Sequence, residues 1–151
     1  MNGVLDALLR FEFAQAAAFR RASEALDVSE SDLNALRGLV AHADENGMAM
    51  KDLAQDVGVS PAVLTGIADR LEERGWIRRQ LHRTDRRSTV VVPTVAEGSD
   101  VLEVLRALDD PLRKVANSLP ADAAAMVKNL AAAMVAELRD FDPEAVVGRR
   151  A

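Results

Sequence analysis

Arginine side chains are concentrated in one short stretch of this 151-residue sequence. Between residues 74 and 87, a single acid, Asp85, stands against six arginines: Arg74, Arg78, Arg79, Arg83, Arg86 and Arg87. This arginine strip has a formal charge of +5, whereas the remaining chain, with 13 basic and 23 acidic residues, has a charge of −10. The asymmetry suits a protein that binds a polyanion at one place and is repelled from it elsewhere. A run of charges is more often a solvated surface, so the strip needs support from its surroundings.

A helix predicted just before the strip presents residues that could contact nucleic-acid bases. Ser60 is its predicted N-cap, and Pro61 is its first residue, where the missing N–H costs nothing. The inward residues follow helical spacing: Leu64, Ile67, Ala68 and Leu71. The outward residues are mostly small: Ser60, Pro61, Ala62, Val63, Thr65, Gly66, Asp69 and Arg70. The hydroxyl groups could bond a base edge or a phosphate, and Ala62 or Val63 could touch a thymine methyl group.

The hydrophobic periodicity predicts the elements that carry these residues. Helical spacing predicts helices over 4–26, 29–43, 50–57, 61–74, 95–119 and 120–141. Pro111 should kink or interrupt the fifth of these near Asp109 and Asp110. Between the fourth and fifth, the segments 76–83 and 88–93 read as a β-hairpin with a basic tip.

The order of helix, tight turn, capped helix and hairpin is that of a winged helix-turn-helix. The predicted fold class is mainly α with a small β-hairpin wing. Residues 47–94 are expected to form the DNA-binding domain, and residues 1–46 and 95–143 a helical dimerisation region. Residues 144–151 show no pattern and are expected to be a mobile tail.

Several motifs in this layout resemble those of the MarR (multiple-antibiotic-resistance regulator) family. They are the run Leu53-Ala54-x-x-Val57-Gly58-Val59-Ser60-Pro61-Ala62, then Thr65, Asp69-Arg70-Leu71-Glu72, Gly75, Arg79 and Asp85-Arg86-Arg87. The most specific part is the Asp-Arg-Arg at the hairpin tip, and the resemblance covers most of residues 5–138. It implies a winged-helix homodimer that binds a palindromic operator in double-stranded DNA. It also implies repression or, less often, activation, relieved by a small-molecule effector.

The resemblance also implies which residues contact DNA. By position, the recognition-helix contacts are Ser60, Ala62, Val63, Thr65, Gly66 and Arg70, and the wing contacts are Arg86 and Arg87. Pro61 and Arg83 complete the predicted DNA-binding set, and Asp85 is expected to steady a wing arginine. The sequence does not decide which of Arg86 and Arg87 enters the minor groove, although a guanidinium suits that narrow, negative groove.

Two segments depart from the family pattern. The family usually has an Asp-Pro pair before the Asp-Arg-Arg, but His82 and Arg83 stand there, which makes the tip more basic and could alter its turn. The family's Leu-Thr-x-x-Gly after the wing is one residue longer here, as Pro93-Thr94-x-x-x-Gly98. Thr94 is still expected to cap the fifth helix.

Other chemistries find little support. The chain has no cysteine, which excludes disulfides and thiolate zinc sites, and its two histidines lack the spacing of metal ligands. Ser60 has no nearby base, and no glycine-rich phosphate loop is present, so neither an enzyme nor a cofactor is expected. Without a signal peptide or a long apolar run, a cytoplasmic protein with no membrane contact is expected.

The sequence therefore predicts a ligand-responsive DNA-binding transcription regulator, and a repressor in preference to an activator. The sequence does not identify the residues of its effector pocket. The lining of that pocket is expected to include parts of the first, second and fifth helices. The alternative is a winged-helix protein-interaction module that has lost DNA binding. The arginine strip beside a small-residue helix favours the first interpretation.

Overall fold

The computed structural model describes residues 3–85 and 88–147 as a mainly helical chain with one small antiparallel sheet. It divides into two compact units, residues 1–109 and 110–151. The helices of the first unit are α1 (Gly3–Leu26), α2 (Glu30–His42), α3 (Met50–Val57), α4 (Pro61–Glu73) and the first part of α5 (Asp100–Ser118). The second unit contains the rest of α5, α6 (Ala121–Arg139) and α7 (Pro143–Val147).

The sheet has three strands in the order β1-β3-β2: β1 (Met48–Ala49), β2 (Ile77–Leu81) and β3 (Thr89–Pro93). β2 pairs with β3 from Ile77 opposite Pro93 to Leu81 opposite Thr89, as the predicted hairpin requires. β1, for which the sequence predicted no strand, pairs with Val90 and Val91. Gly47 makes this possible, because a Cβ there would lie 2.7 Å from the carbonyl oxygen of Val91.

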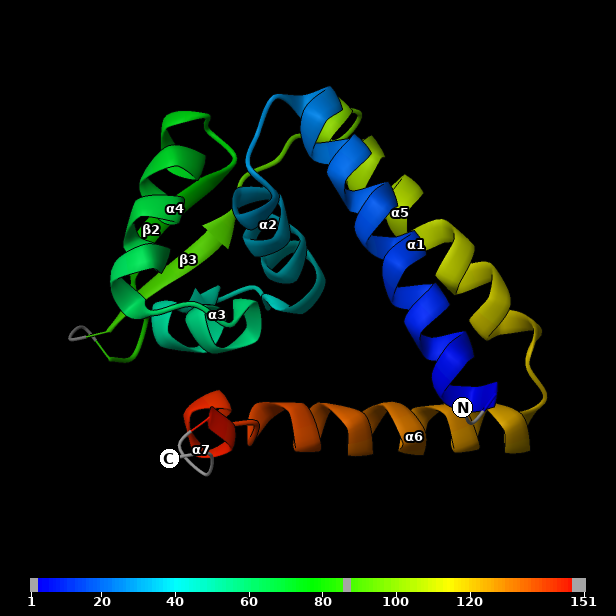
Figure 1. The fold of residues 1–151 in the computed structure, drawn as a ribbon. Coiled ribbons are helices and arrows are strands. Elements are labelled where there is room, and N and C mark those ends of the chain that lie inside the picture. Colours follow the sequence, from blue (N-terminus) through cyan, green and yellow to red (C-terminus); the bar gives the residue numbers. More distant parts are fainter. Residues whose placement is uncertain (1–2, 86–87, 148–151) are drawn as a thin grey trace. The chain divides into compact units, whose positions relative to one another are not determined.

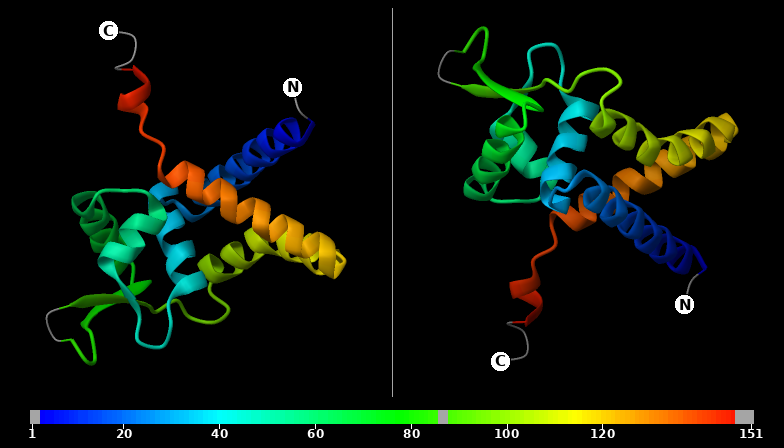
Figure 2. Two further views of the ribbon diagram at one scale, coloured as in Figure 1. Left: turned by 90° about the horizontal axis from the view of Figure 1, so that it is seen from below. Right: turned by 90° about the horizontal axis from the view of Figure 1, so that it is seen from above.

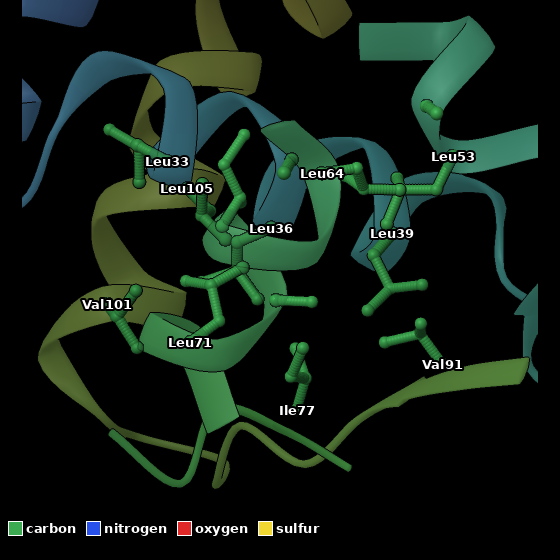
Figure 3. Packing of buried hydrophobic residues seen from close by; sticks show 14 of the residues in the cluster. Leu33, Leu36, Leu39, Leu53, Leu64, Leu71, Ile77, Val91, Val101 and Leu105 are labelled. Carbon is green, nitrogen blue, oxygen red and sulfur yellow. The ribbon is translucent and has the colours of Figure 1, made fainter. Parts of the chain in front are cut away.

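One apolar core holds the helices of the first unit against the sheet. Figure 3 shows side chains from α2, α3, α4, both hairpin strands and α5 pointing toward one another. The fully buried large residues are Leu33, Leu36, Leu39, Leu53, Leu64, Ile67, Leu71, Val90 and Val91. All four residues predicted to face inward from α4 are buried. The core therefore fixes which side of α4 remains outside.

The fifth helix differs from its prediction at both Thr94 and Pro111. It begins at Asp100, since Gly98 adopts a left-handed φ of 74° that an α-helix does not allow. Thr94 does not cap it; the hydroxyl of Thr94 donates to the carbonyl of Gly75 at 2.8 Å, closing the base of the hairpin. Pro111 does not interrupt α5, which continues through it to Ser118.

The apolar side chains spaced along α5 are not all buried in one core. Val101 and Leu105 are buried in the core of the first unit, whereas Leu112 and Val115 are exposed. Residues 143–147 form the short helix α7. This helix overlaps the segment 144–151, for which the sequence predicted no helix or strand. No helix within the described part of the chain is long and apolar enough to cross a membrane.

Candidate nucleic-acid interface

The helix-turn-helix is formed by α3 and α4, which are joined at Gly58 and Val59. Gly58 ends α3 in the left-handed conformation, with φ 75°, and its N–H donates to the carbonyl of Ala54 at 2.9 Å. Ser60 then caps α4: its hydroxyl oxygen accepts a hydrogen bond from the N–H of Val63 at 3.3 Å. The predicted cap and first-turn proline are therefore confirmed, and the turn directs α4 away from α3 (Figure 1).

The outward side of α4 consists of the residues predicted from the sequence. Ser60, Pro61, Ala62, Val63, Thr65, Asp69 and Arg70 are exposed, and Gly66 is half-buried. Strands β2 and β3 lie beside this helix and project from the helices of the unit, as both views in Figure 2 show. The geometry of a winged helix-turn-helix is thus present, with one exposed helix next to a two-stranded wing.

Arg79 joins the wing to α4. Its guanidinium donates to Asp69 at 2.6 Å, to Glu72 at 2.6 Å and to the carbonyl oxygen of Thr65 at 3.1 Å. The backbone N–H of Arg79 also donates to Glu72, at 2.9 Å. Arg79 is therefore not a free cation of the strip; it fixes β2 against the helix.

These bonds change the acid–base properties of the pair. The backbone N–H of Arg79 is the main reason that the pKa of Glu72 is lowered; partial burial opposes this effect and the guanidinium adds to it. Burial lowers the pKa of Arg79, but hydrogen bonds with Asp69 and Glu72 outweigh it and the pKa is raised overall. Both groups are therefore held in their charged forms.

Arg70, predicted to contact DNA, is bonded inside the protein. Its guanidinium donates to both carboxylate oxygens of Asp32 on α2, at 2.9 and 2.6 Å. The Asp32 side chain is 7% exposed and that of Arg70 is 52% exposed. The hydrogen bond to Asp32 is the main reason that the pKa of Arg70 is raised. No sequence signal identified Asp32, which ties α4 to α2.

The arginine strip is thus less uniform than its sequence suggested. Arg74 donates to the carbonyl of Asp27 at 2.6 Å and lies over the ring of Trp76, 5.1 Å from its centroid. Arg78 is exposed and donates to Gln80 at 3.3 Å, and Arg83 is exposed. Arg86 and Arg87, the predicted wing contacts, lie outside the described residues.

His82 shapes the wing turn where the family has an aspartate. Its Nδ1 accepts hydrogen bonds from the backbone N–H groups of Thr84 and Asp85, at 3.3 and 3.2 Å. The Thr84 hydroxyl lies 3.1 Å from the same nitrogen. An unprotonated imidazole nitrogen thus takes the place of a carboxylate as the acceptor in the turn.

Asp85, the predicted wing support, closes the other side of the turn. Its carboxylate accepts a hydrogen bond from the Ser88 hydroxyl at 2.6 Å, and its carbonyl accepts one from the Ser88 N–H at 3.0 Å. The arginine that it was expected to steady is among the residues not described.

A pocket of about 370 Å³ opens among α1, α2 and the turn after α3. Its lining includes Glu12, Phe19, Glu30, Asn34 and Arg37. Arg37 is ion-paired with Asp109 on α5 and lies 5.9 Å from the centroid of the Phe19 ring. The pocket therefore combines an aromatic face with charged groups. Within residues 3–85 and 88–147, no group of three metal-ligating side chains lies together.

Comparison with known proteins agrees with this geometry. The MarR family model matches residues 33–89. The chain is 32% identical, over 90 residues, to YcgE, an uncharacterised helix-turn-helix transcriptional regulator of Bacillus subtilis. That match covers 59% of this chain and 56% of the relative, so the chain spans about half the length of the curated relative.

Solved structures share the fold. A MepR mutant of S. aureus bound to an oligodeoxyribonucleotide matches 91% of this chain and 98% of its own, with a TM-score of 0.55 and 19% identity. CouR from Rhodococcus jostii RHA1, bound to p-coumaroyl-CoA, matches 93% of this chain and 94% of its own, with a TM-score of 0.62 and 20% identity. The fold and the exposed helix beside its wing define a winged-helix domain. Within that domain, residues 33–89 are similar to the MarR family.

Proposed function

We propose that this protein is a transcription regulator that binds a palindromic operator through α4 and the wing. The observation that carries the proposal is the Arg79 fork, meaning the hydrogen bonds from its guanidinium to Asp69 and Glu72, which join the exposed, small-residue helix to the hairpin. We call α4 and the hairpin together the reading head. An exposed helix of this kind fits the major groove, while the wing reaches the adjacent backbone or minor groove. The DNA-bound MepR mutant supports this interpretation through its fold.

A palindromic operator requires two copies of the reading head, and α6 supports a homodimer. None of its residues is buried, although it carries the exposed apolar side chains Met126, Val127, Leu130, Val135 and Leu138. An apolar helix surface of this extent is typical of a protein interface. We therefore assign residues 1–46 and 95–143 to dimerisation and residues 47–94 to DNA binding.

The role of the regulator is proposed to be repression that an effector relieves. The pocket containing Phe19 and Arg37 is the proposed effector site, and the ligand-bound CouR supports such a site by analogy of fold. A ligand there would favour a spacing of the two reading heads that mismatches the grooves. If each half-site loses about 1.4 kcal/mol, affinity falls about a hundredfold.

Salt-dependent binding tests the DNA-binding function. A duplex enriched from a random library by the protein should bind, and its affinity should fall steeply with salt as counterions are released. The double variant Arg86→Ala with Arg87→Ala should lose at least about tenfold in affinity and have a shallower salt dependence. The matched control is Arg139→Ala, which removes a charge from α6 outside the reading head. Failure to enrich or bind any duplex at low salt would favour the protein-interaction module instead.

A ligand-screened thermal shift tests the effector site. A compound that binds the native state should raise the melting temperature, and Ala16→Phe, which fills the pocket, should abolish the rise. Ala25→Phe, an exposed alanine on the same helix but outside the pocket, is the control. An unchanged ligand response in the Ala16 variant would place the effector elsewhere.

A further inference from the structure

The exposed side of α4 has few free hydrogen-bonding side chains. The Thr65 hydroxyl already donates its proton to the carbonyl of Pro61, at 3.0 Å. Asp69 accepts a hydrogen bond from Arg79, and the Arg70 guanidinium is held by both oxygens of Asp32. Each of these three polar side chains therefore has a partner within the protein, and Arg70 is held through its Nε and Nη2 atoms, which limits how it can turn toward a base.

The other polar groups of α4 do not replace them. Glu72 accepts the bonds of Arg79, and Glu73 is a carboxylate at the C-terminal end of the helix, where phosphates would repel it. Ser60 alone keeps a hydroxyl proton that it can donate, while its oxygen caps the helix. What remains toward the groove is apolar: Ala62, Gly66 and Val63, a residue that is 51% exposed.

This composition limits which bases the helix can read. In the major groove, guanine presents two acceptors, which require strong donors such as a free arginine or lysine. Thymine presents a methyl group, which an apolar side chain can contact directly. Given the proposed function, we infer that α4 selects A·T pairs by packing Val63, with Ala62 beside it, against thymine methyl groups. Val63 is then the specificity-determining residue.

Removing the methyl group from the DNA tests the inference without altering the protein. After enrichment of an operator from a random library, each thymine of the half-sites is replaced in turn by deoxyuridine, which lacks only that methyl group. Affinity should fall about fourfold for one critical thymine and about fifteenfold when both half-sites are changed. Deoxyuridine at thymines outside the half-sites is the control and should have no effect.

A variant then assigns the contact to Val63. Val63→Ala should lose most of the discrimination between the thymine and uracil duplexes, because the side chain that senses the methyl group is shortened. Val40→Ala, an exposed valine on α2, should keep the full discrimination. Because Val63 is exposed, its variant should fold normally, which circular dichroism checks.

The possible failures are distinguishable. If the protein binds its operator but no thymine-to-uracil change alters affinity, the inference is overturned and DNA binding stands. A loss of discrimination that Val40→Ala reproduces would also overturn the role of Val63. If the protein binds no duplex more tightly than it binds bulk DNA, the proposed function itself fails.

Discussion

Asp32 on α2 and Arg70 on α4 form a two-bond ion pair in which the acid is buried and the base is half exposed. The two residues lie 38 positions apart in the sequence. Their two hydrogen bonds hold α4 against α2. Because the two side chains differ in burial, their removal should lower the free energy of unfolding by different amounts.

We expect Arg70→Ala to destabilise the protein more than Asp32→Ala. Loss of Arg70 leaves a buried carboxylate without its partner, at a cost of about 2–3 kcal/mol, whereas the guanidinium left by Asp32→Ala can be hydrated. Urea denaturation at fixed protein concentration measures both values. Equal losses, or a greater loss for Asp32→Ala, would contradict this assignment of burial.

The Arg79 fork predicts a loss of DNA affinity that charge alone does not explain. Arg79→Lys keeps the positive charge but cannot donate simultaneously to Asp69, Glu72 and Thr65. Operator affinity should fall severalfold, while the salt dependence stays close to that of the parent protein. Arg78→Lys, on the same strand, is the control. A change in salt slope would show that Arg79 contacts phosphate directly.

Glu72 predicts a pH dependence of stability. Its pKa is lowered in the folded protein from an ordinary value of 4.5, so its contribution is present above that value. As pH falls below 4.5 toward the lowered pKa, the unfolded state gains the proton first and the contribution is lost. Glu72→Gln should therefore weaken the dependence of the melting temperature on pH in this acidic range. An unaltered pH profile would argue against the bond to Arg79.

His82 predicts that the wing turn requires an acceptor at this position. His82→Asn retains a side-chain oxygen that can accept from the N–H groups of Thr84 and Asp85, whereas His82→Ala does not. DNA affinity should be nearly retained in the first variant and reduced severalfold in the second. Hydrogen exchange of the two amides reports the turn directly; equal protection in both variants would exclude the acceptor role.

Leucines on α5 and α6 separate folding from dimerisation. Leu105→Glu places a charge in the core, where Leu105 is 3% exposed, and should unfold the protein. Leu130→Glu alters an exposed residue on α6, so the helical content should persist while the proposed dimer dissociates. Circular dichroism and sedimentation together distinguish these results. A folded dimer in the Leu130 variant would remove α6 from the interface.

Much of the fold was predictable because local signals agreed with one another. The Ser60 cap, Pro61 and the spacing of Leu64 to Leu71 predicted both α4 and its buried side. β1 was missed since two residues are too short for a periodic signal, and its pairing with β3 depends on Gly47. The predicted start of α5 was wrong because the left-handed φ of Gly98 prevents the helix from including the apolar residues before it.

The sequence by itself determined the winged-helix order, the outward residues of α4 and the concentration of arginines near the hairpin. Only the tertiary structure decided which partners the arginines of the described residues find. Arg70 and Arg79 find their acids through the packing of α2, α4 and β2, so spacing along the chain cannot reveal the pairs. A buried or partly buried charge is costly without a partner, so these arginines pair with acids within the fold. Their pairing leaves the proposed recognition surface of α4 mainly apolar and centred on Val63.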